Sequence, residues 1–135
     1  MIAIDTSAVV AVAQLAPEAA ELRRYIEEAP SACLSAVSLQ EILAVMLGRR
    51  GDATILAPLD RLLRDMRLQI VSHDEELASL ASEAFFRFGK GRHPARLNFG
   101  DCASYALAKK YCIPLLFKGT DFAKTDIVPA LPAPA

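Results

Sequence analysis

Blocks of apolar residues along the chain predict strands and helices in alternation. Runs with almost no polar residue occur at 2–4, 32–34, 69–71 and 114–117, and such runs are typical of short parallel strands buried on both faces. Between them, apolar residues recur every three or four positions, which predicts helices with one buried face. The expected helices include residues 9–13, 20–26, 42–47, 52–66, 74–88 and 101–111.

The order of these segments determines the expected fold class. Strands that alternate with helices form a parallel sheet covered by helices on both sides. We therefore predict an α/β protein, a three-layer α/β/α sandwich with a parallel sheet of four to five strands, the fifth at 127–128. The 135 residues have the size of one domain. We expect this domain to span residues 1–128 and the Pro/Ala-rich residues 129–135 to form a flexible tail.

Local signals predict where two of the helices begin and end. Thr6 or Ser7 is expected to cap the first helix, because a side-chain oxygen at that position can accept a hydrogen bond from a free backbone amide. Ser38 and Glu41 match a capping box in front of an apolar run. Gly48 is expected to end the helix that this box begins.

Composition and charge exclude several classes of protein. Fifteen Lys and Arg against sixteen Asp and Glu give a formal net charge of −1, so nucleic-acid binding would need a local basic patch. No apolar run reaches the length of a membrane-spanning helix, and no secretory leader precedes the first strand. We therefore expect a cytoplasmic protein that does not contact a membrane.

Four acidic residues fall where the carboxyl ends of the predicted strands meet. Asp5 follows the first strand, and Glu41 lies in the first turn of the helix after the second strand. Asp101 begins the helix that leads into the last long strand, and Asp121 follows that strand. Because open parallel sheets bind ligands at this edge, we expect the four side chains to converge.

Converging carboxylates predict a metal site. They repel one another and raise each other's pKa, and a divalent cation removes this conflict. The three cysteines form no Cys-x-x-Cys pair and the two histidines are twenty residues apart, so oxygen ligands and therefore Mg²⁺ or Mn²⁺ are favoured. Such sites are typical of phosphodiester hydrolysis. Each acid also has a structural alternative: Asp5 as a helix cap, Glu41 as part of the capping box, and Asp101 as a charge at a helix N-terminus.

Four segments carry a resemblance to a known family. They are Ile4-Asp5-Thr6-Ser7, residues 38–41, Leu97-Asn98-Phe99-Gly100-Asp101-Cys102 and residues 115–122. In order and spacing they resemble the PIN-domain ribonucleases, specifically the VapC-type toxins of toxin–antitoxin operons. The resemblance extends over residues 1–128.

This resemblance implies a set of site residues. It implies that four acids bind Mg²⁺ or Mn²⁺ and that Thr6 or Ser7 supports the first of them. Gly119 departs from the family pattern, since many PIN domains have Asp or Asn at that place, two positions before the fourth acid. Asp126 is therefore a second candidate for the fourth acid. The implied metal ligands are Asp5, Glu41, Asp101 and Asp121.

Basic residues crowd into the ten positions before the third acidic segment. Cations there can neutralise a phosphate backbone beside an acidic site, whereas the alternative is an ordinary solvated loop. Phe99 and Tyr105 are expected in the core or in a dimer interface rather than in base recognition. The basic cluster consists of Arg87, Lys90, Arg92, His93 and Arg96, of which the four Lys and Arg residues are expected to bind RNA.

Two other functions are compatible with the sequence. One is a phosphotransferase of the haloacid-dehalogenase type with Asp5 as covalent nucleophile, although that chemistry requires a second Asp where this chain has Ser7. The other is a non-enzymatic domain that only binds a partner protein.

The helices carry more large apolar residues than one small sheet needs, which predicts an interface. We expect a homodimer. The resemblance further implies a groove on the first helices for an antitoxin, with a basic antitoxin residue near Asp5 and Glu41. The expected partners are thus RNA, a cognate antitoxin and a second copy of the chain.

Overall fold

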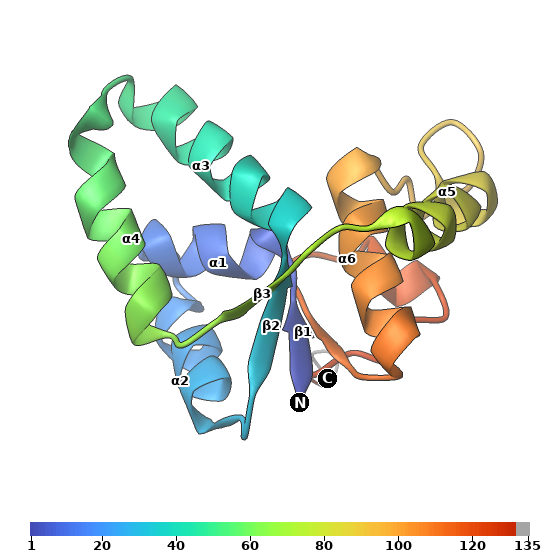
Figure 1. Cartoon of the computed structure of the whole chain (residues 1–135), viewed down its shortest axis with the longest axis horizontal. Helices are drawn as coiled ribbons and strands as arrows, with labels where there is room; N and C mark the ends of the chain where they lie inside the picture. The colour runs from blue at the N-terminus through green and yellow to red at the C-terminus, as the bar shows by residue number, and fades with distance from the viewer. Residues whose placement is uncertain (132–135) are drawn as a thin grey trace.

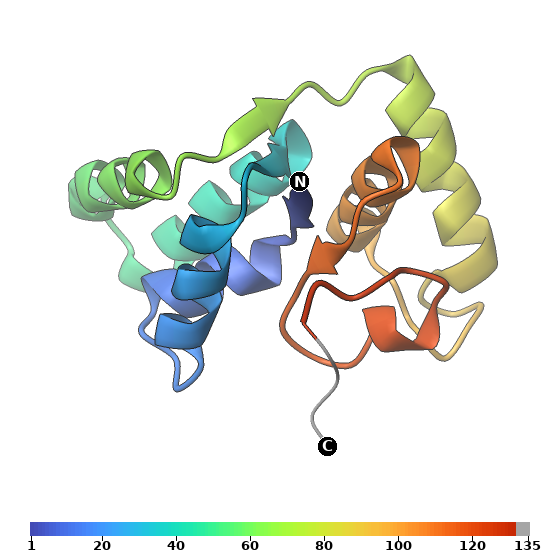
Figure 2. The same ribbon diagram turned by 90° about the horizontal axis from the view of Figure 1, so that it is seen from below.

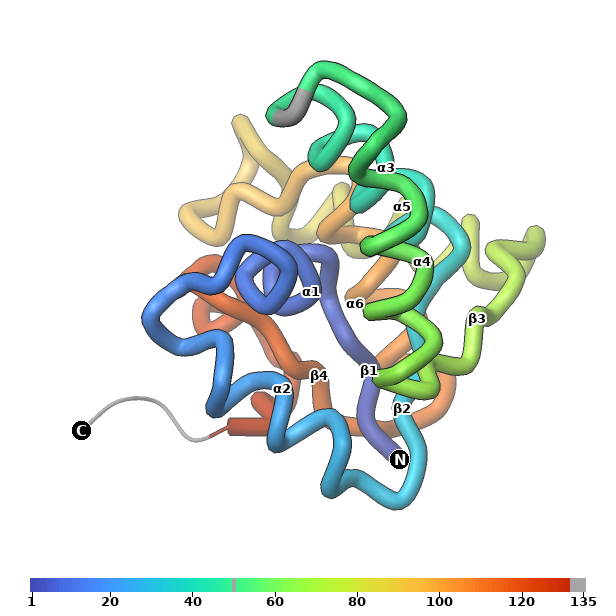
Figure 3. The backbone as a smooth tube through the Cα atoms, turned by 90° about the vertical axis from the view of Figure 1, so that its left-hand side faces the viewer, coloured from blue at the N-terminus to red at the C-terminus, as the bar shows by residue number. Residues whose placement is uncertain are grey.

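The computed structural model describes residues 1–131, apart from the side chain of Arg50, and in this part four short strands form one sheet. They are β1 (Ile2–Ile4), β2 (Ala32–Ser35), β3 (Gln69–Val71) and β4 (Leu115–Leu116). All pairings are parallel, in the order β3-β2-β1-β4. Figure 3 shows β1 running from the N-terminus toward the start of the first helix, so the carboxyl ends of the strands form the edge where helices begin.

Six helices within residues 1–131 cover the two faces of this sheet. They are α1 (Thr6–Ala13), α2 (Ala19–Glu28), α3 (Ala36–Arg50), α4 (Leu56–Asp65), α5 (Glu75–Phe88) and α6 (Phe99–Tyr111), with short 3₁₀ turns η1 (Ala53–Ile55) and η2 (Phe122–Lys124). Figures 1 and 2 show α1–α4 on one side and α5 and α6 on the other. The predicted three-layer α/β/α fold is confirmed. None of these helices is long and apolar enough to cross a bilayer.

Successive residues of the buried strands face opposite helix layers. Ile4 and Leu34 pack into the apolar cluster under α1–α4, whereas their neighbours Ala3 and Cys33 pack into the cluster under α5 and α6. Because both faces are covered, each strand position must be apolar, and the sequence shows no alternation. β3 lies at the edge, and its Ile70 is 44% exposed.

The first helix is capped by an acid. Asp5, rather than the predicted Thr6 or Ser7, precedes α1, and its carboxylate accepts a hydrogen bond from the Ser7 amide at 3.0 Å. The carboxylate thereby satisfies one of the free amides at the helix start. The structural alternative for this acid is therefore real, but it occupies only part of the carboxylate's hydrogen-bonding capacity.

The predicted limits of α3 are also wrong at both ends. Ser35 caps the helix by accepting a hydrogen bond from the Val37 amide at 3.1 Å, so Ser38 lies inside the helix and forms no capping box. The helix continues through Gly48 and stops only at Gly51, whose φ of +78° is the left-handed conformation that favours glycine.

The chain after residue 128 differs from the predicted tail. Pro129 forms a parallel bridge with Leu115, and the Ala130 carbonyl accepts a hydrogen bond from the Tyr25 hydroxyl at 2.5 Å. This bridge replaces the predicted fifth strand at 127–128. Residues 129–131 thus belong to the packed domain, and residues 132–135 of the predicted tail lie outside the described residues.

Candidate active site

Asp5 is a buried carboxylate held by three donors. Its side chain is 2% exposed at the end of β1. One oxygen, Oδ2, accepts hydrogen bonds from the Ser7 amide at 3.0 Å and the Ser7 hydroxyl at 2.6 Å. The other, Oδ1, accepts from the Ser104 hydroxyl at 2.5 Å. Both carboxylate oxygens are therefore fixed in position, as a pre-organised ligand requires.

Two serines of this arrangement were not among the predicted site residues. Ser104 is fully buried in α6, and its hydroxyl oxygen lies 3.2 Å from the hydroxyl oxygen of Ser38, which is buried in α3. Through Ser104, these two helices meet the end of β1. No local pattern signals this role, because Ser104 is 99 positions from Asp5 in the sequence.

Ser7 links the first acid to the loop after β4. Its hydroxyl donates to Asp5 and accepts a hydrogen bond from the Lys118 amide at 3.0 Å. The geometry thus agrees with Ser7, not Thr6, as the hydroxyl that supports Asp5. The Thr6 hydroxyl is buried and has no hydrogen-bond partner among residues 1–131.

Glu41 lies against the first turn of α6. A Cβ atom built on Gly100 would stand only 2.6 Å from Glu41 Oε1 and 2.7 Å from its Cδ. Such distances are far shorter than real contacts allow, so only glycine leaves room for the carboxylate here. The Glu41 carboxylate therefore occupies the space directly beside Asp101, the next residue of the helix.

The pKa of Asp101 depends on its burial and on the other acids. It lies in the first turn of α6, where its Oδ2 accepts a hydrogen bond from the Asn98 amide at 3.0 Å in a capping box. Burial raises the pKa of Asp101 to about 6; the Asn98 amide opposes this rise, and the carboxylates of Asp5, Glu41 and Asp121 add to it. Four acids from four separate segments thus share one field at the carboxyl edge of the sheet, where Figure 1 shows α1, α3 and α6 beginning.

Asp126, the second candidate for the fourth acid, belongs to a different cluster. Its Oδ1 accepts a hydrogen bond from the Tyr105 hydroxyl at 2.6 Å, and its Oδ2 pairs with Lys109 at 3.0 Å and Arg87 at 3.9 Å. Burial acts to raise the pKa of Asp126, but these hydrogen bonds and cations outweigh it and lower the pKa. Its charge is already compensated by the protein, whereas that of Asp121 adds to the field at Asp101.

The donor set at this edge fits a hard divalent cation. The four acids offer carboxylate oxygens, the ligands that Mg²⁺ and Mn²⁺ prefer, and Gly100 leaves a cradle in which the Glu41 carboxylate rests. In the described part of the chain, no three His, Cys, Asp or Glu side chains are spaced as a ready-made metal shell.

Comparison with known proteins identifies the family. The PIN domain family matches residues 2–128. Ribonuclease VapC42 of Mycobacterium tuberculosis is 43% identical over 128 residues, which cover 94% of this chain and 97% of the relative. The chain belongs to the VapC ribonucleases of the PIN domain family. The family resemblance predicted from the sequence is therefore confirmed.

Other VapC proteins extend the comparison. Ribonuclease VapC of Mycolicibacterium smegmatis is 42% identical over 124 residues, covering 92% of this chain and 95% of the relative. The crystal structure of Mycobacterium tuberculosis VapC20, described as a sarcin-ricin loop cleaving toxin, has a TM-score of 0.74, covers 95% of this chain and 97% of its own, and is 21% identical. At this identity the structural likeness supports the fold alone.

The two candidates for the fourth acid of this VapC chain give opposite expected results. Asp121→Asn should reduce RNA cleavage by more than about 10-fold, because it removes an anionic ligand, with little loss of stability since Asp121 is exposed. Asp126→Asn should retain cleavage but lower the free energy of unfolding by about 1 to 2 kcal/mol, because hydrogen bonds to a charged group are lost. Cleavage rates and urea denaturation of both variants measure this. Loss of cleavage in Asp126→Asn alone would reverse the assignment.

The basic segment of the VapC chain divides into two groups. Arg87 contacts the Phe88 ring in addition to Asp126, and its side chain is still 47% exposed. Arg92 donates to the Phe86 carbonyl at 3.1 Å and stacks on that ring. Lys90 and Arg96 are exposed, as is Arg92. All four predicted RNA-binding cations therefore lie on the surface, and Arg87 is the one that also pairs with Asp126.

The structure separates Phe99 and Tyr105, the two aromatic residues of α6 that were predicted to lie in the core or in a dimer interface. Tyr105 is buried, as expected, and its hydroxyl donates to Asp126. Phe99, in contrast, is 79% exposed at the start of the helix. It is therefore not part of the core of the VapC fold.

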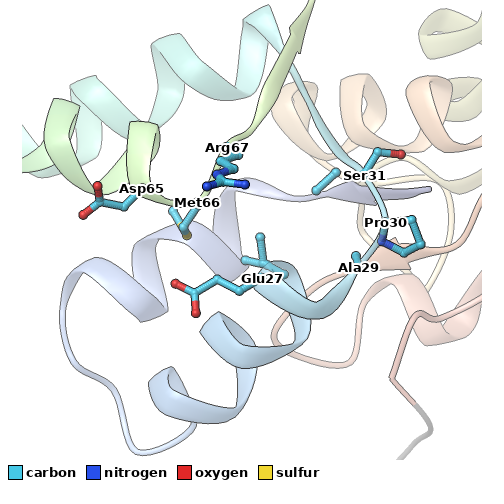
Figure 4. A pocket seen from close by; sticks show the side chains of 9 residues that line it. Glu27, Ala29, Pro30, Ser31, Asp65, Met66 and Arg67 are labelled. Atoms are coloured by element: carbon cyan, nitrogen blue, oxygen red, sulfur yellow. The ribbon is translucent and has the colours of Figure 1, made fainter.

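A hollow of about 340 Å³ lies at the opposite edge of the sheet (Figure 4). It is bounded by the loop that enters β2, by α2 and by the turn before β3, and Glu27, Asp65 and Arg67 line it. Arg23 pairs with Glu27 at 2.8 Å and reaches Asp65 at 4.0 Å. This hollow lies at the amino ends of the strands and contains none of the four acids of the VapC site.

Proposed function

We propose that this chain is a Mg²⁺- or Mn²⁺-dependent endoribonuclease that acts in the cytoplasm as the toxin of a toxin–antitoxin pair. The observation that carries this proposal is the electrostatic interaction among Asp5, Glu41, Asp101 and Asp121. Burial is the main reason that the pKa of Asp101 rises to about 6, and the other three carboxylates add to the rise. Membership of the VapC ribonucleases supports the reaction class. It also argues against the phosphotransferase and the non-enzymatic alternatives.

The four carboxylates would hold the cation, and the surrounding residues would position them. Ser7 and Ser104 keep both oxygens of Asp5 oriented, while Gly100 leaves space for Glu41. When bound, a divalent cation lowers the pKa of water and offsets charge on the scissile phosphate. Lys90, Arg92 and Arg96 would bind flanking phosphates of the RNA and so hold the strand in line with the acids.

This reaction is a hydrolysis in which water attacks phosphorus and an oxygen of the RNA leaves. The ribose 2′-hydroxyl is not needed as a nucleophile. We expect products without 2′,3′-cyclic phosphate ends, analysed by mass spectrometry of a cleaved oligoribonucleotide. Cyclic phosphate ends would show attack by the 2′-hydroxyl and would contradict the proposed mechanism.

Replacing Arg92 and Arg96 with alanine should flatten the salt dependence of RNA binding. Each phosphate contact to a single strand contributes about −0.7 to the slope of log affinity against log salt, so losing two contacts should change the slope by about 1.4. Fluorescence anisotropy at several salt concentrations measures this slope. The matched control is Arg24→Ala with Arg61→Ala, two exposed arginines on α2 and α4 in the other helix layer. Equal slopes for the two double variants would remove the basic loop from the RNA path.

An antitoxin would occupy the apolar hollow between α2 and the end of β4. This hollow has a volume of about 420 Å³, includes Leu22, Phe117 and Leu131, and continues to Lys118 in the loop beside the acids. An apolar segment seated there could place a basic residue near Asp5 and Glu41, where pairing with the carboxylates would block the cation. The product of the neighbouring gene is the natural probe, and inhibition of cleavage by it is the expected result.

We further propose that the chain is a homodimer. Large apolar side chains remain exposed on both helix layers, among them Leu15 at 85% and Phe86 at 68%. Light scattering at tens of micromolar should therefore give twice the chain mass of 14.6 kDa. A mass of one chain at that concentration would contradict a dimer and leave the catalytic proposal unaffected.

A further inference from the structure

Phe99 stands between two hollows at the start of α6. It is 79% exposed, although the residues on either side of it are committed to structure: Asn98 caps the helix and Gly100 packs under Glu41. A single exposed aromatic side chain is ordinary on a protein surface, but Phe99 lines two hollows at once, and one of them contains Glu41. Its position points to a ligand.

The first hollow connects Phe99 to the acids. It measures about 340 Å³ and lies between α3 and α6, with Gln40, Glu41, Asn98 and Phe99 in its wall. Glu41 is one of the four clustered carboxylates. A strand that lies in this hollow with a phosphate at Glu41 would pass next to the Phe99 ring.

The second hollow continues on the other side of the same ring. It measures about 360 Å³, lies between α5 and α6, and is bounded by Phe85, Phe99, Cys102 and His73. Phe85 is 43% exposed. Two aromatic side chains with a mainly apolar floor form the kind of surface that binds a flat, unsaturated ring.

The cations nearby indicate what carries that ring. Arg96 and Lys90 are exposed on the loop that leads into α6, the helix that begins with Phe99, and the acid Glu41 lines the first hollow. Exposed aromatics next to cations bind single-stranded nucleic acid, because each base has a face for stacking and each linkage has a charge.

We propose that Phe99, with Phe85 and the hollow between α5 and α6, binds an unpaired nucleobase adjacent to the scissile phosphate. This inference rests on the proposed ribonuclease function. It makes Phe99 a substrate-binding residue that selects unpaired over paired RNA, since both faces of a base in a duplex are already stacked. The rival occupant is the same face of a second copy of this chain.

The experiment compares Phe99→Ala with two other variants. Phe99→Tyr keeps a ring that can stack, and Tyr111→Ala removes an exposed aromatic at the other end of α6, outside both hollows. All are made in the full chain carrying Asp101→Asn, so that RNA is bound without being cut. Affinity for a fluorescent single-stranded oligoribonucleotide is measured by anisotropy, and mass by light scattering.

We expect Phe99→Ala to bind the single strand about 10-fold more weakly, the loss typical of one stacked base. Phe99→Tyr and Tyr111→Ala should keep the parent affinity, and the difference between Phe99→Ala and its parent should vanish on duplex RNA. Equal affinities for Phe99→Ala and Tyr111→Ala would overturn the inference, as would a Phe99→Ala protein that binds normally but no longer dimerises. If the unmodified chain cleaves RNA, either of these outcomes removes the role of Phe99 but leaves the ribonuclease function intact. If the unmodified chain neither cleaves nor binds RNA, the ribonuclease function and the role of Phe99 are both overturned.

Discussion

Asp101→Asn is expected to abolish RNA cleavage, with a loss of more than about 100-fold, because removal of a partner that only orients metal ligands already costs 10- to 100-fold. The substitution keeps the side-chain volume. The Asn side-chain oxygen can still accept the hydrogen bond from the Asn98 amide that completes the capping box. Loss of activity would therefore report the missing charge rather than a broken helix.

The same variant should make the metal-free protein more stable, and only above a certain pH. Burial raises the pKa of Asp101 to about 6, and the neighbouring acids Asp5, Glu41 and Asp121 add to this rise. The folded state therefore binds the carboxyl proton of Asp101 more tightly than the unfolded state does. Stability therefore falls as pH rises from about 4 to about 6. At pH 7 the ionised carboxyl costs about 2 kcal/mol, allowing for its partial exposure.

Urea denaturation of the two proteins in EDTA measures this effect. Asp101→Asn should unfold at higher urea than the unmodified chain at pH 7, and the gap should close toward pH 4. A suitable control is Glu75→Gln, which changes an exposed acid in the first turn of α5 that lies outside the acidic cluster. Cleavage by Asp101→Asn at the rate of this control would remove Asp101 from the site.

Gly100→Ala is expected to disable the enzyme without unfolding it. The new methyl group would meet Glu41 at 2.6 Å from Oε1, and the carboxylate, being the end of a flexible side chain, would move away. We expect cleavage to fall by about 10- to 100-fold, the range for a displaced ligand or its support, and Mn²⁺ affinity to fall with it. Stability should change little, because alanine is favoured over glycine in a helix by about 0.5–1 kcal/mol.

Gly48→Ala is the matched control for this variant. Gly48 also lies inside a helix, and a Cβ added there meets no atom within 4 Å. This control should gain the same helix stabilisation and keep full cleavage and Mn²⁺ affinity. Equal activity in the two variants would show that the position of Glu41 over Gly100 is not required.

The approach of the four acids to one another was predictable because each lies at a strand end or a helix start. Asp5, Asp101 and Asp121 needed only the rule that parallel sheets bind ligands at the carboxyl edge. The choice between Asp121 and Asp126 needed the structure, because it depends on Tyr105 and Lys109 reaching Asp126 from α6. Sequence spacing along one loop carries no information on contacts with another helix.

Other features were missed for the same physical reason. In the sequence, Ser38 matches the start of a capping box as well as Ser35 matches an N-cap. Only the packing of α3 against α6 shows that Ser35 is the cap and that Ser38 faces Ser104 inside the fold. Phe99 was expected in the core or in a dimer interface, because aromatic residues are often found there. In the structure its neighbour Gly100 packs under Glu41, while Phe99 itself is 79% exposed. Periodicity thus predicted the layers, while contacts between distant segments assembled the site.

The most direct test of the site is RNA cleavage by the unmodified chain after removal of metal. Burial raises the pKa of Asp101, and the carboxylates of Asp5, Glu41 and Asp121 add to this rise, so the four acids repel one another in the metal-free protein. The enzyme stripped with EDTA should therefore be inactive, and titration with Mg²⁺ or Mn²⁺ should restore cleavage to the unmodified chain but not to Asp101→Asn. Full cleavage in EDTA, or equal restoration of both proteins, would contradict a metal-dependent ribonuclease built on these carboxylates.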